Sequence, residues 1–340
     1  MKARTLFAAL ISTVLAAPAA RAQDAEEFYR SHDVSIVVAT TPGGTYDLMA
    51  RFLALHLAQH IPGNPRVIVR NMPGAGGILD ANYLWRTASA DGTTIAALLN
   101  NVAFEPLFGT KQAIYDPLRL NWIGSSNAET AFLAVWHDVP VMTLEDARIH
   151  AIRVGASAVT SAPTFFARLL NAALGTKLQV IPGYPGSEDA FLAMQHGELD
   201  GYGSFFTSDL NASKQAMIGD GDLRLIVQYG PQPEPDYPDV PFAPDQVTDP
   251  DTRALMQAGF ALLAVGRPYA MPPGVPADRL AAMRQAFADT IHDPAVVEEG
   301  KRLGLRVDRG QTFDRLNDVI AAAYATPPRI VEALRQLKLQ

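Results

Sequence analysis

The stretch TTPGGTYDLMAR, residues 40–51, decides how the first folding unit of this chain is built. It follows the run VSIVVA, residues 34–39, whose β-branched residues predict a strand that ends before the proline. The two glycines permit a tight turn, because glycine takes up positive φ without a steric penalty. An amphipathic pattern over residues 46–59 then predicts a helix. A strand, a glycine turn and a helix N-terminus make either an anion-binding cradle or an ordinary connection.

The same unit recurs along the chain, and its repetition predicts an α/β fold with mostly parallel sheets. We expect strands at residues 34–39, 66–69, 94–99, 152–155, 179–181, 199–205 and 224–229, with helices at 46–59 and 78–89. A proline-rich connection follows at residues 231–245. The C-terminal region is then expected to hold a helix at 250–258, a strand at 260–265, a turn at 268–276 and long helices from residue 277 onward.

This C-terminal region lacks a sheet of its own, so we expect it to return and cover the first sheet. The arrangement predicts a discontinuous first domain, residues 24–128 plus 248–340, with a second domain, residues 129–247, inserted into it. Two connections between two lobes form a hinge. Because ligands of α/β lobes bind outside the carboxyl ends of the strands, the predicted ligand cleft lies between the lobes.

The first 22 residues have the pattern of a secretory signal peptide. Lys2 and Arg4 form a short basic segment, an apolar run follows, and Ala20-Arg21-Ala22 matches a small-x-small cleavage site. The apolar run is too short for a convincing membrane span. These features predict an exported chain, which in a Gram-negative bacterium is periplasmic.

The composition excludes several kinds of site and partner. The sequence has no cysteine, which excludes disulfides, thiolate metal sites, a cysteine nucleophile and a lipidated cysteine. The whole chain has 28 basic and 35 acidic residues, and the leader holds three of the basic ones. No basic cluster is present, so nucleic acid and anionic membrane surfaces are poor partners.

The sequence fails the common catalytic templates. His56 and His60 share one helix face, but no glutamate follows His56 as it does in zinc proteases. GASAV, residues 155–159, has valine where a nucleophile elbow needs its second glycine. PGAGGIL, residues 73–79, has leucine at the third glycine position of the dinucleotide fingerprint. The histidines do not supply a recognisable nucleophile–base pair.

With the catalytic templates excluded, four strand-to-helix turns remain as candidate ligand sites, and each consists mostly of small or polar residues. They are PGGTYD (42–47), MPGAGG (72–77), ASAVTSAP (156–163) and GYPGSED (183–189). Each can present main-chain N–H groups at a helix N-terminus, where the helix dipole favours an anion. Hydroxyl donors with little bulk come from Thr45, Ser157, Thr160, Ser161 and Ser187. We expect these local donors, without a fixed cationic side chain, to recognise the ligand, since distant surface charge is screened beyond about 8–10 Å.

Two long segments resemble a known family. VATTPGGTYDLMARFLALHL (38–57) and NMPGAGGILDANYLWRTASADGTT (71–94) are similar in order and spacing to the Bug family, the extracytoplasmic binding receptors of tripartite tricarboxylate transporters. VGASAVTSAP (154–163), GYPGSEDAFLAMQHGELDG (183–201) and PPGVPADRLAAMRQAFADTIHDPAV (272–296) also resemble family segments. The resemblance covers nearly all of the chain beyond the leader.

The resemblance implies a two-domain periplasmic binding protein, type II-like, that closes around a small organic carboxylate. Such a receptor delivers its ligand to the membrane permease subunits of the transporter; it is implied to be a monomer without cofactor or metal. Ligand contacts carried over from the family fall on Gly43, Gly44, Thr45, Tyr46, Asp47, Ala75, Gly76, Gly77, Ser157, Thr160, Ser161, Tyr184, Gly186 and Ser187. Tyr46 stands where many members have a small residue, so the identity of the ligand stays open.

Several of these residues have two interpretations. Asp47 lies in a first helical turn with Arg51 four residues on, so it either supports the turn or contacts a ligand donor or water. Tyr46 either stacks on a planar ligand or packs against the other lobe. Ser126 and Asn127 lie at the end of WIGSSN, residues 122–127, which looks like a strand, and they either face the cleft or form a polar loop.

The sequence therefore predicts a periplasmic receptor for a small carboxylate rather than an enzyme. One alternative is a secreted α/β hydrolase acting on a carboxylated substrate, which would need His137 or His196 within about 3.2 Å of a cleft serine. Another alternative is a sensor-subunit binding protein, which would have the same cleft and a different partner.

Overall fold

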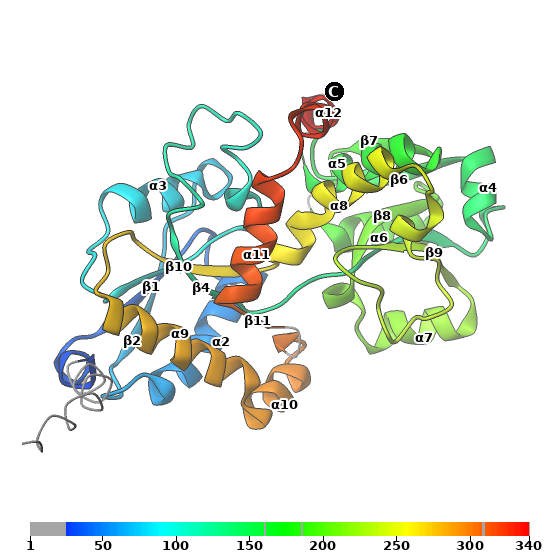
Figure 1. The fold of residues 1–340 in the computed structure, drawn as a ribbon. Helices are drawn as coiled ribbons and strands as arrows, with labels where there is room; N and C mark the ends of the chain where they lie inside the picture. Colours follow the sequence, from blue (N-terminus) through cyan, green and yellow to red (C-terminus); the bar gives the residue numbers. More distant parts are fainter. Residues whose placement is uncertain (1–24, 160, 185, 308–309, 340) are drawn as a thin grey trace, which may run out of the picture.

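The computed structural model describes residues 25–339 apart from residues 160, 185, 308 and 309. The predicted signal peptide and its cleavage site therefore lie outside the described residues. Within them the chain forms two sheets, one in each half of the molecule, joined by crossing segments and by a long helix between the halves (Figure 1). No helix in the described ranges is long and apolar enough to cross a membrane.

The first sheet has six strands in the order β11-β4-β10-β3-β1-β2. Its strands are β1 (Val34–Val38), β2 (Val67–Asn71), β3 (Thr94–Ala97), β4 (Asn121–Ser125), β10 (Pro268–Met271) and β11 (Gln311–Thr312). β1 pairs in parallel with both β2 and β3, whereas β10 runs antiparallel between β3 and β4. The returning C-terminal region thus contributes two strands to this sheet, in addition to helices.

The second sheet has five strands in the order β7-β6-β8-β5-β9. They are β5 (Ala131–Trp136), β6 (Ala151–Ala156), β7 (Lys177–Pro182), β8 (Gly201–Phe206) and β9 (Leu223–Tyr229). β6 is parallel to β7 and β8, while β5 is antiparallel to β8 and β9. The two sheets confirm the predicted α/β class, but they are mixed rather than mostly parallel, because β5, β10 and β11 pair antiparallel with their neighbours. The strands of the two sheets separate between residues 125 and 131 and between residues 229 and 268.

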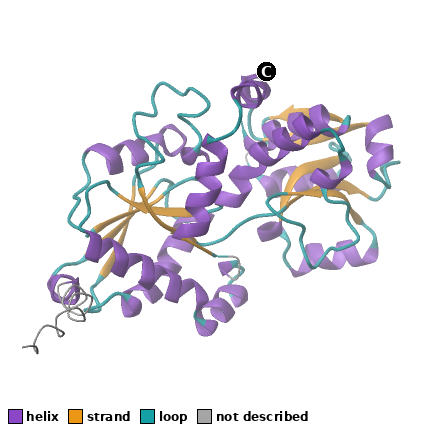
Figure 2. Ribbon diagram, viewed as in Figure 1, coloured by secondary structure: helices purple, strands orange, loops and turns teal. Residues whose placement is uncertain are grey.

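Helices cover both sheets (Figure 2). On the first sheet lie α2 (Thr45–His60), α3 (Ile78–Arg86), α9 (Ala277–His292) and α10 (Pro294–Arg302). Around the second lie α4 (Leu144–Ile149), α5 (Ala162–Leu174), α6 (Ser187–Gln195) and α7 (Ala212–Asp220). The C-terminal α11 (Phe313–Tyr324) packs on β4 and α8 (Pro250–Val265), and α12 (Pro328–Leu339) packs on α8 and α5.

The structure corrects two of the predicted elements. Residues 260–265, expected as a strand, are the last turns of α8, and PYAM at the start of the expected turn is strand β10. The run from Phe260 to Val265 is apolar at every position and entirely buried, so it shows no periodicity that separates a strand from a buried helix. Gly259 lies inside α8 and does not end it. Because glycine has no side chain, α8 can approach Leu169 of α5 closely at this position.

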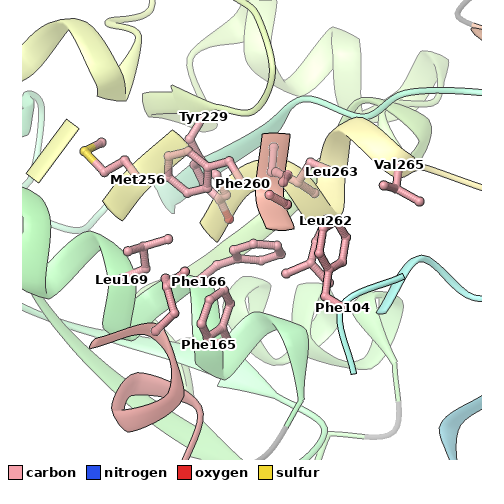
Figure 3. Close-up of a cluster of buried hydrophobic side chains, with 14 of the residues drawn as sticks. Phe104, Phe165, Phe166, Leu169, Tyr229, Met256, Phe260, Leu262, Leu263 and Val265 are labelled. Carbon is pink, nitrogen blue, oxygen red and sulfur yellow. The ribbon is translucent and has the colours of Figure 1, made fainter. Parts of the chain in front are cut away.

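Aromatic side chains join α8 to the second half of the molecule (Figure 3). The ring of Phe260 lies 4.9 Å from that of Tyr229 on β9 and 6.3 Å from that of Phe166 on α5, measured between centroids. All three side chains are almost completely buried. The same continuous core includes Phe104 and Trp122 from the first half, so the two halves share one apolar cluster at this end.

Phe260→Ala tests whether this cluster supports the whole fold. Removing a fully buried phenylalanine ring leaves a cavity, and we expect the free energy of unfolding to fall by about 3–5 kcal/mol. The measurement is urea denaturation followed by circular dichroism. Leu55→Ala is the control, since Leu55 lies on α2 with 76% of its surface exposed, and it should change stability by less than about 0.5 kcal/mol. Equal, small effects of the two variants would contradict the central role of the cluster.

Candidate functional site

The carboxyl edges of the two sheets face one another. β1, β2 and β3 all end at one edge of the first sheet, and β4, which is separated from β3 by antiparallel β10, ends at the same edge. Residues 126–130 then lead directly into β5, whose first residue, Ala131, pairs with Phe206 at the end of β8. Because β6, β7 and β8 run in parallel, the crossing segment connects the carboxyl edge of one sheet to that of the other. The four polar turns all lie at these edges.

The first turn leads from β1 into α2. Gly43 has φ of +86°, and Gly44 is the N-cap of the helix without a capping side chain. Gly43, Gly44 and Thr45 are exposed, and the Gly43 N–H is taken up by a hydrogen bond to Asp47. Tyr46 is half-buried, and its hydroxyl donates to the carbonyl of Gly266 at 3.3 Å, which holds the ring within the first half of the molecule.

Asp47 is buried and holds this turn together. One carboxylate oxygen accepts from Arg51 Nε at 2.9 Å and from the Gly43 main chain at 2.8 Å, and the other accepts from Asn71 Nδ2 at 2.8 Å. The hydrogen bonds from Arg51, Gly43 and Asn71 lower the pKa of Asp47 to about 2. Since Asn71 ends β2, this carboxylate also joins the first turn to the second. Its contacts favour the supporting role over a ligand contact.

The second turn has a left-handed backbone. Ala75, Gly76 and Gly77 have φ of +47°, +61° and +86°, and α3 begins at the next residue. Ala75 and Gly76 are exposed, whereas Gly77 is buried against Leu99 and Val102. The Asn101 amide donates to the carbonyl of Gly76 at 3.1 Å, so the turn also contacts the residues that follow β3.

The turns of the second half lie at the ends of β6 and β7. Ser157 is exposed, while Ser161 is the N-cap of α5 and its hydroxyl donates to the carbonyl of Ala158 at 2.7 Å. Thr160, also predicted as a contact, lies outside the described residues. Gly186 is the N-cap of α6, and Ser187 is its first residue. Tyr184 packs beside Gly155 of β6, with its main-chain N–H bonded to Ala156.

Ser126 and Asn127 are buried in the hinge. The Ser126 N–H donates to the carbonyl of Arg267 at 3.0 Å, and Asn127 Nδ2 donates to Glu129 Oε1 at 2.6 Å. Ser125, one residue earlier, donates its hydroxyl to the carbonyls of Asn127 and Val265. The residues after β4 and those before β10 therefore run side by side. Both predicted residues belong to this crossing, with Ser126 and Asn127 side chains fully covered.

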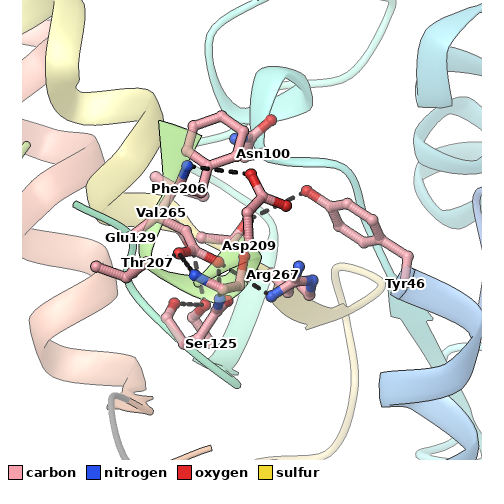
Figure 4. A network of polar contacts seen from close by, with 12 residues as sticks. Tyr46, Asn100, Ser125, Glu129, Phe206, Thr207, Asp209, Val265 and Arg267 are labelled. Atoms are coloured by element: carbon pink, nitrogen blue, oxygen red, sulfur yellow. Dashed lines mark hydrogen bonds and ion pairs between the residues drawn. The ribbon is translucent and has the colours of Figure 1, made fainter. Parts of the chain in front are cut away.

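Arg267, Glu129, Thr207 and Asp209, which the sequence patterns missed, lie in the region beside Tyr46 (Figure 4). Arg267 lies over the Tyr46 ring at 5.3 Å from its centroid, and its Nη1 is 3.3 Å from Glu129 Oε1. The other oxygen of Glu129 accepts from the Thr207 hydroxyl at 2.8 Å, at the carboxyl edge of the second sheet. Asp209 lies two residues further on. Arg267 is thus a cationic side chain where the two edges meet, and the expectation of a site without a fixed cationic side chain did not include it.

The carboxylate of Asp209 is the perturbed acid of this region. Burial raises its pKa to about 6, and the nearby charge of Glu129 adds to the effect, although a hydrogen bond from the Phe206 main chain opposes it. The hydroxyl of Tyr46 also has a raised pKa, because it is buried. Near neutral pH the region thus contains the Arg267 charge beside Glu129, and the carboxyl of Asp209 is close to protonation.

The hydrolase alternative requires a histidine beside a serine of the cleft. Among the residues that the structure describes, neither His137 nor His196 forms a side-chain hydrogen bond with a serine. His56 and His60 instead lie near Glu299 and Asp293, on the helices that cover the first sheet. Within the described ranges, no cluster of three histidine or acidic side chains is arranged to hold a metal ion.

Two cavities lie beside the hinge, away from the polar turns. One of about 620 Å³ is enclosed by α8, α11 and the loop after β9, and an adjoining one of about 370 Å³ reaches Glu129 and Gln311. None of the predicted ligand residues lines either cavity. The larger is lined mainly by alanine, proline and phenylalanine, which offer few donors to an anion, so the turns at the carboxyl edges are the better candidate site.

Comparison with known proteins gives a consistent result. The sequence pattern of the family described as "Tripartite tricarboxylate transporter family receptor" matches residues 49–335. A Cupriavidus necator protein, "UPF0065 protein in gbd 5'region", is 30% identical over 243 residues, covering 69% of this chain and 70% of the relative.

Solved structures share the fold. A TctC solute-binding protein from Polaromonas, solved without ligand, superimposes with a TM-score of 0.68 at 20% identity, covering 91% of this chain and 98% of the other. MatC from Rhodopseudomonas palustris, solved with bound malate, gives a TM-score of 0.60 at 19% identity, covering 90% and 98% of the two chains. These similarities confirm the two-lobed architecture.

Asp47→Asn tests the supporting role of this carboxylate. The change removes a buried charge that accepts three hydrogen bonds, so we expect a loss of about 1.5–3 kcal/mol in unfolding free energy at pH 7. Because the pKa of Asp47 is depressed to about 2 in the folded protein, its stabilisation is complete above the unfolded value near 4 and disappears as pH falls through about 2. The difference between variant and parent should shrink over the same range.

Denaturant titrations at several pH values measure this effect. Asp314→Asn is the matched control, because Asp314 is an exposed acid in the first turn of α11. The supporting role would be refuted by an Asp47→Asn protein that unfolds like the control at every pH.

For Asp209→Asn we expect a pH dependence of stability opposite to that of Asp47→Asn. The pKa of Asp209 is raised to about 6, so its charged form destabilises the folded protein above that pH, and the penalty disappears as pH falls toward 4. The asparagine oxygen can still accept from Phe206. We expect the variant to have the higher Tm at pH 7.5 and the Tm values to converge at pH 4. The exposed Asp222→Asn is the control, and a constant Tm difference across this range would contradict the assignment.

Proposed function

Because the chain belongs to the tripartite tricarboxylate transporter receptor family, we propose that it is a periplasmic solute-binding receptor for a small organic carboxylate. The observation that carries the proposal is the placement of four polar turns at the facing carboxyl edges of the two sheets. A ligand between the edges would contact both halves of the molecule at once. The malate held by MatC supports this class of ligand.

The first sheet would supply main-chain donors from the turns before α2 and α3. The exposed Gly43, Gly44 and Thr45 stand at the N-terminus of α2, where the helix dipole favours an anion. The left-handed turn at Ala75–Gly77 turns successive main-chain groups toward the same edge, an arrangement suited to anions. Asp47 would hold the first turn rather than touch the ligand.

The second sheet would contribute the turns before α5 and α6. Ser157 and Ser161 supply hydroxyl groups near the N-terminus of α5, and Gly186 and Ser187 begin α6. Tyr184 would form an apolar wall beside them. Ligand contacts from both sheets would favour a closed arrangement of the two domains, residues 24–128 plus 248–340 and residues 129–247, about the crossing segments.

In this proposal the receptor acts as a monomer in the periplasm and passes its ligand to the permease subunits of a tripartite transporter, which recognise the closed form. The proposed mode of binding requires neither cofactor nor metal, and among the described residues neither His137 nor His196 bonds to a serine. A sensor partner would use the same closed form, and pull-down with the membrane subunits encoded beside the receptor distinguishes the two.

Calorimetric titration of the ligand-free protein tests the ligand class directly. Malate, adipate, citrate and benzoate form the panel, and the corresponding neutral amides are the controls. We expect one-to-one binding of at least one acid and no binding of its amide. A ligand at one hundred times its Kd should also stabilise the fold by about 2.7 kcal/mol, visible as a higher Tm. A folded protein that binds no member of the panel would overturn the proposal.

A further inference from the structure

The guanidinium of Arg267 has an N–H donor, at Nε, without a hydrogen-bond partner among the described residues. Its side chain is 12% exposed, and Nε is buried without a hydrogen-bond partner. Its sole charged contact among the described residues is the 3.3 Å approach of Nη1 to Glu129. A buried guanidinium normally satisfies its donors, because an unpaired buried donor is destabilising.

Other arginines in the chain show what a satisfied environment looks like. Arg284, which lies over the Phe313 ring as Arg267 lies over Tyr46, donates Nε to the carbonyl of Trp122 at 2.9 Å. Arg279 and Arg335 also have buried Nε atoms without partners, but each donates an Nη group to a carbonyl at 2.7–2.8 Å. Arg267 lacks such a bond, and of these four it is the one located where the two carboxyl edges meet.

Its neighbours hold the guanidinium in place. The Tyr46 ring covers one face at 5.3 Å, and the hydroxyl of that tyrosine is bonded to Gly266, the residue before the arginine. The main chain of Arg267 is held by the N–H of Ser126. Glu129 contacts Nη1, and Nε, on the opposite edge of the guanidinium, is buried with no hydrogen-bond partner among the described residues. That edge is the side on which arginine binds a carboxylate through two parallel hydrogen bonds.

We propose that Arg267 binds a carboxylate of the ligand through Nε and Nη2, with Tyr46 as its platform and Glu129 as its counter-ion. This inference rests on the proposed function and names the residue that distinguishes a carboxylate from a neutral isostere. The main-chain N–H groups of the turns can bind many oxygen-rich ligands. The planar guanidinium of Arg267 instead favours a planar anion such as a carboxylate. Arg267 lies in no polar turn, which is why the turns alone did not indicate it.

Substitution at Arg267 tests the assignment, with the probe being whichever of malate, adipate, citrate and benzoate the unaltered protein binds. Arg267→Met should weaken that affinity at least 100-fold while changing affinity for the corresponding amide less than threefold. Arg267→Lys should weaken it at least 10-fold, because lysine keeps the charge and loses the fork. Arg119→Met is the matched control: Arg119 is exposed and lies 5.6 Å over the Trp85 ring, and its loss should change affinity less than twofold.

A double variant separates ligand contact from structural support. Arg267→Met leaves Glu129 with its hydrogen bonds from Asn127 and Thr207 but without its counter-ion, and adding Glu129→Gln removes that uncompensated charge. We expect the double variant to recover the Tm of the parent and to keep the weak affinity. Recovery of affinity together with Tm would mean that Arg267 acts only on the fold and would overturn the inference.

The outcomes for the two proposals are distinct. An unaltered protein that binds no acid of the panel overturns the proposed function and this inference with it. An unaltered protein that binds an acid, combined with an Arg267→Met variant that binds it within threefold, overturns the inference alone. Calorimetry at rising salt adds a check, since loss of Arg267 should flatten the dependence of affinity on ionic strength.

Discussion

The pairing of two crossing segments is the constraint on which the site depends. The Ser125 hydroxyl bonds to the carbonyl of Val265 at 2.7 Å, and the Ser126 N–H bonds to that of Arg267 at 3.0 Å. Gly266 sits against the main chain of Asn127 with φ of +59°, where no side chain would fit. Residues 126–130 follow β4, and residues 266–267 lead into β10 at the same edge of the first sheet. Because the two segments are held side by side, their contact fixes how that edge faces the second sheet. A larger residue at 266 would separate the segments and move both edges.

The sequence predicted the turns well because each depends on local chemistry. A β-branched run, glycines and a helix pattern lie within about fifteen residues, and glycine conformations and helix N-termini follow from that spacing. Glu129, Asp209 and Arg267 follow no such pattern, since they meet only through the fold. Arg267 and Glu129 are 138 residues apart.

The overall charge of the chain and the charge of the site are separate quantities. The chain carries a formal net charge of −7, which alone suggests a poor partner for anions. Solvent screens most of that charge within about 10 Å, whereas the largely buried guanidinium of Arg267 acts at contact distance. Glu129 balances the arginine while the site is empty. The binding of a ligand carboxylate would therefore be opposed less by the net charge of the whole chain than by the nearby acids Glu129 and Asp209.

The position of the ligand contacts between the two sheets, rather than their strength, would make them useful to a receptor. A ligand shifts a conformational equilibrium only by the difference between its affinities for the two states. Contacts with the turns of one sheet would bind the ligand equally in open and closed forms. Arg267 belongs to the first edge, but its counter-ion Glu129 is bonded to Thr207 at the second. A carboxylate on the free side of this arginine would lie next to a bond that already joins the two edges, so its binding energy would depend directly on how far apart they stand.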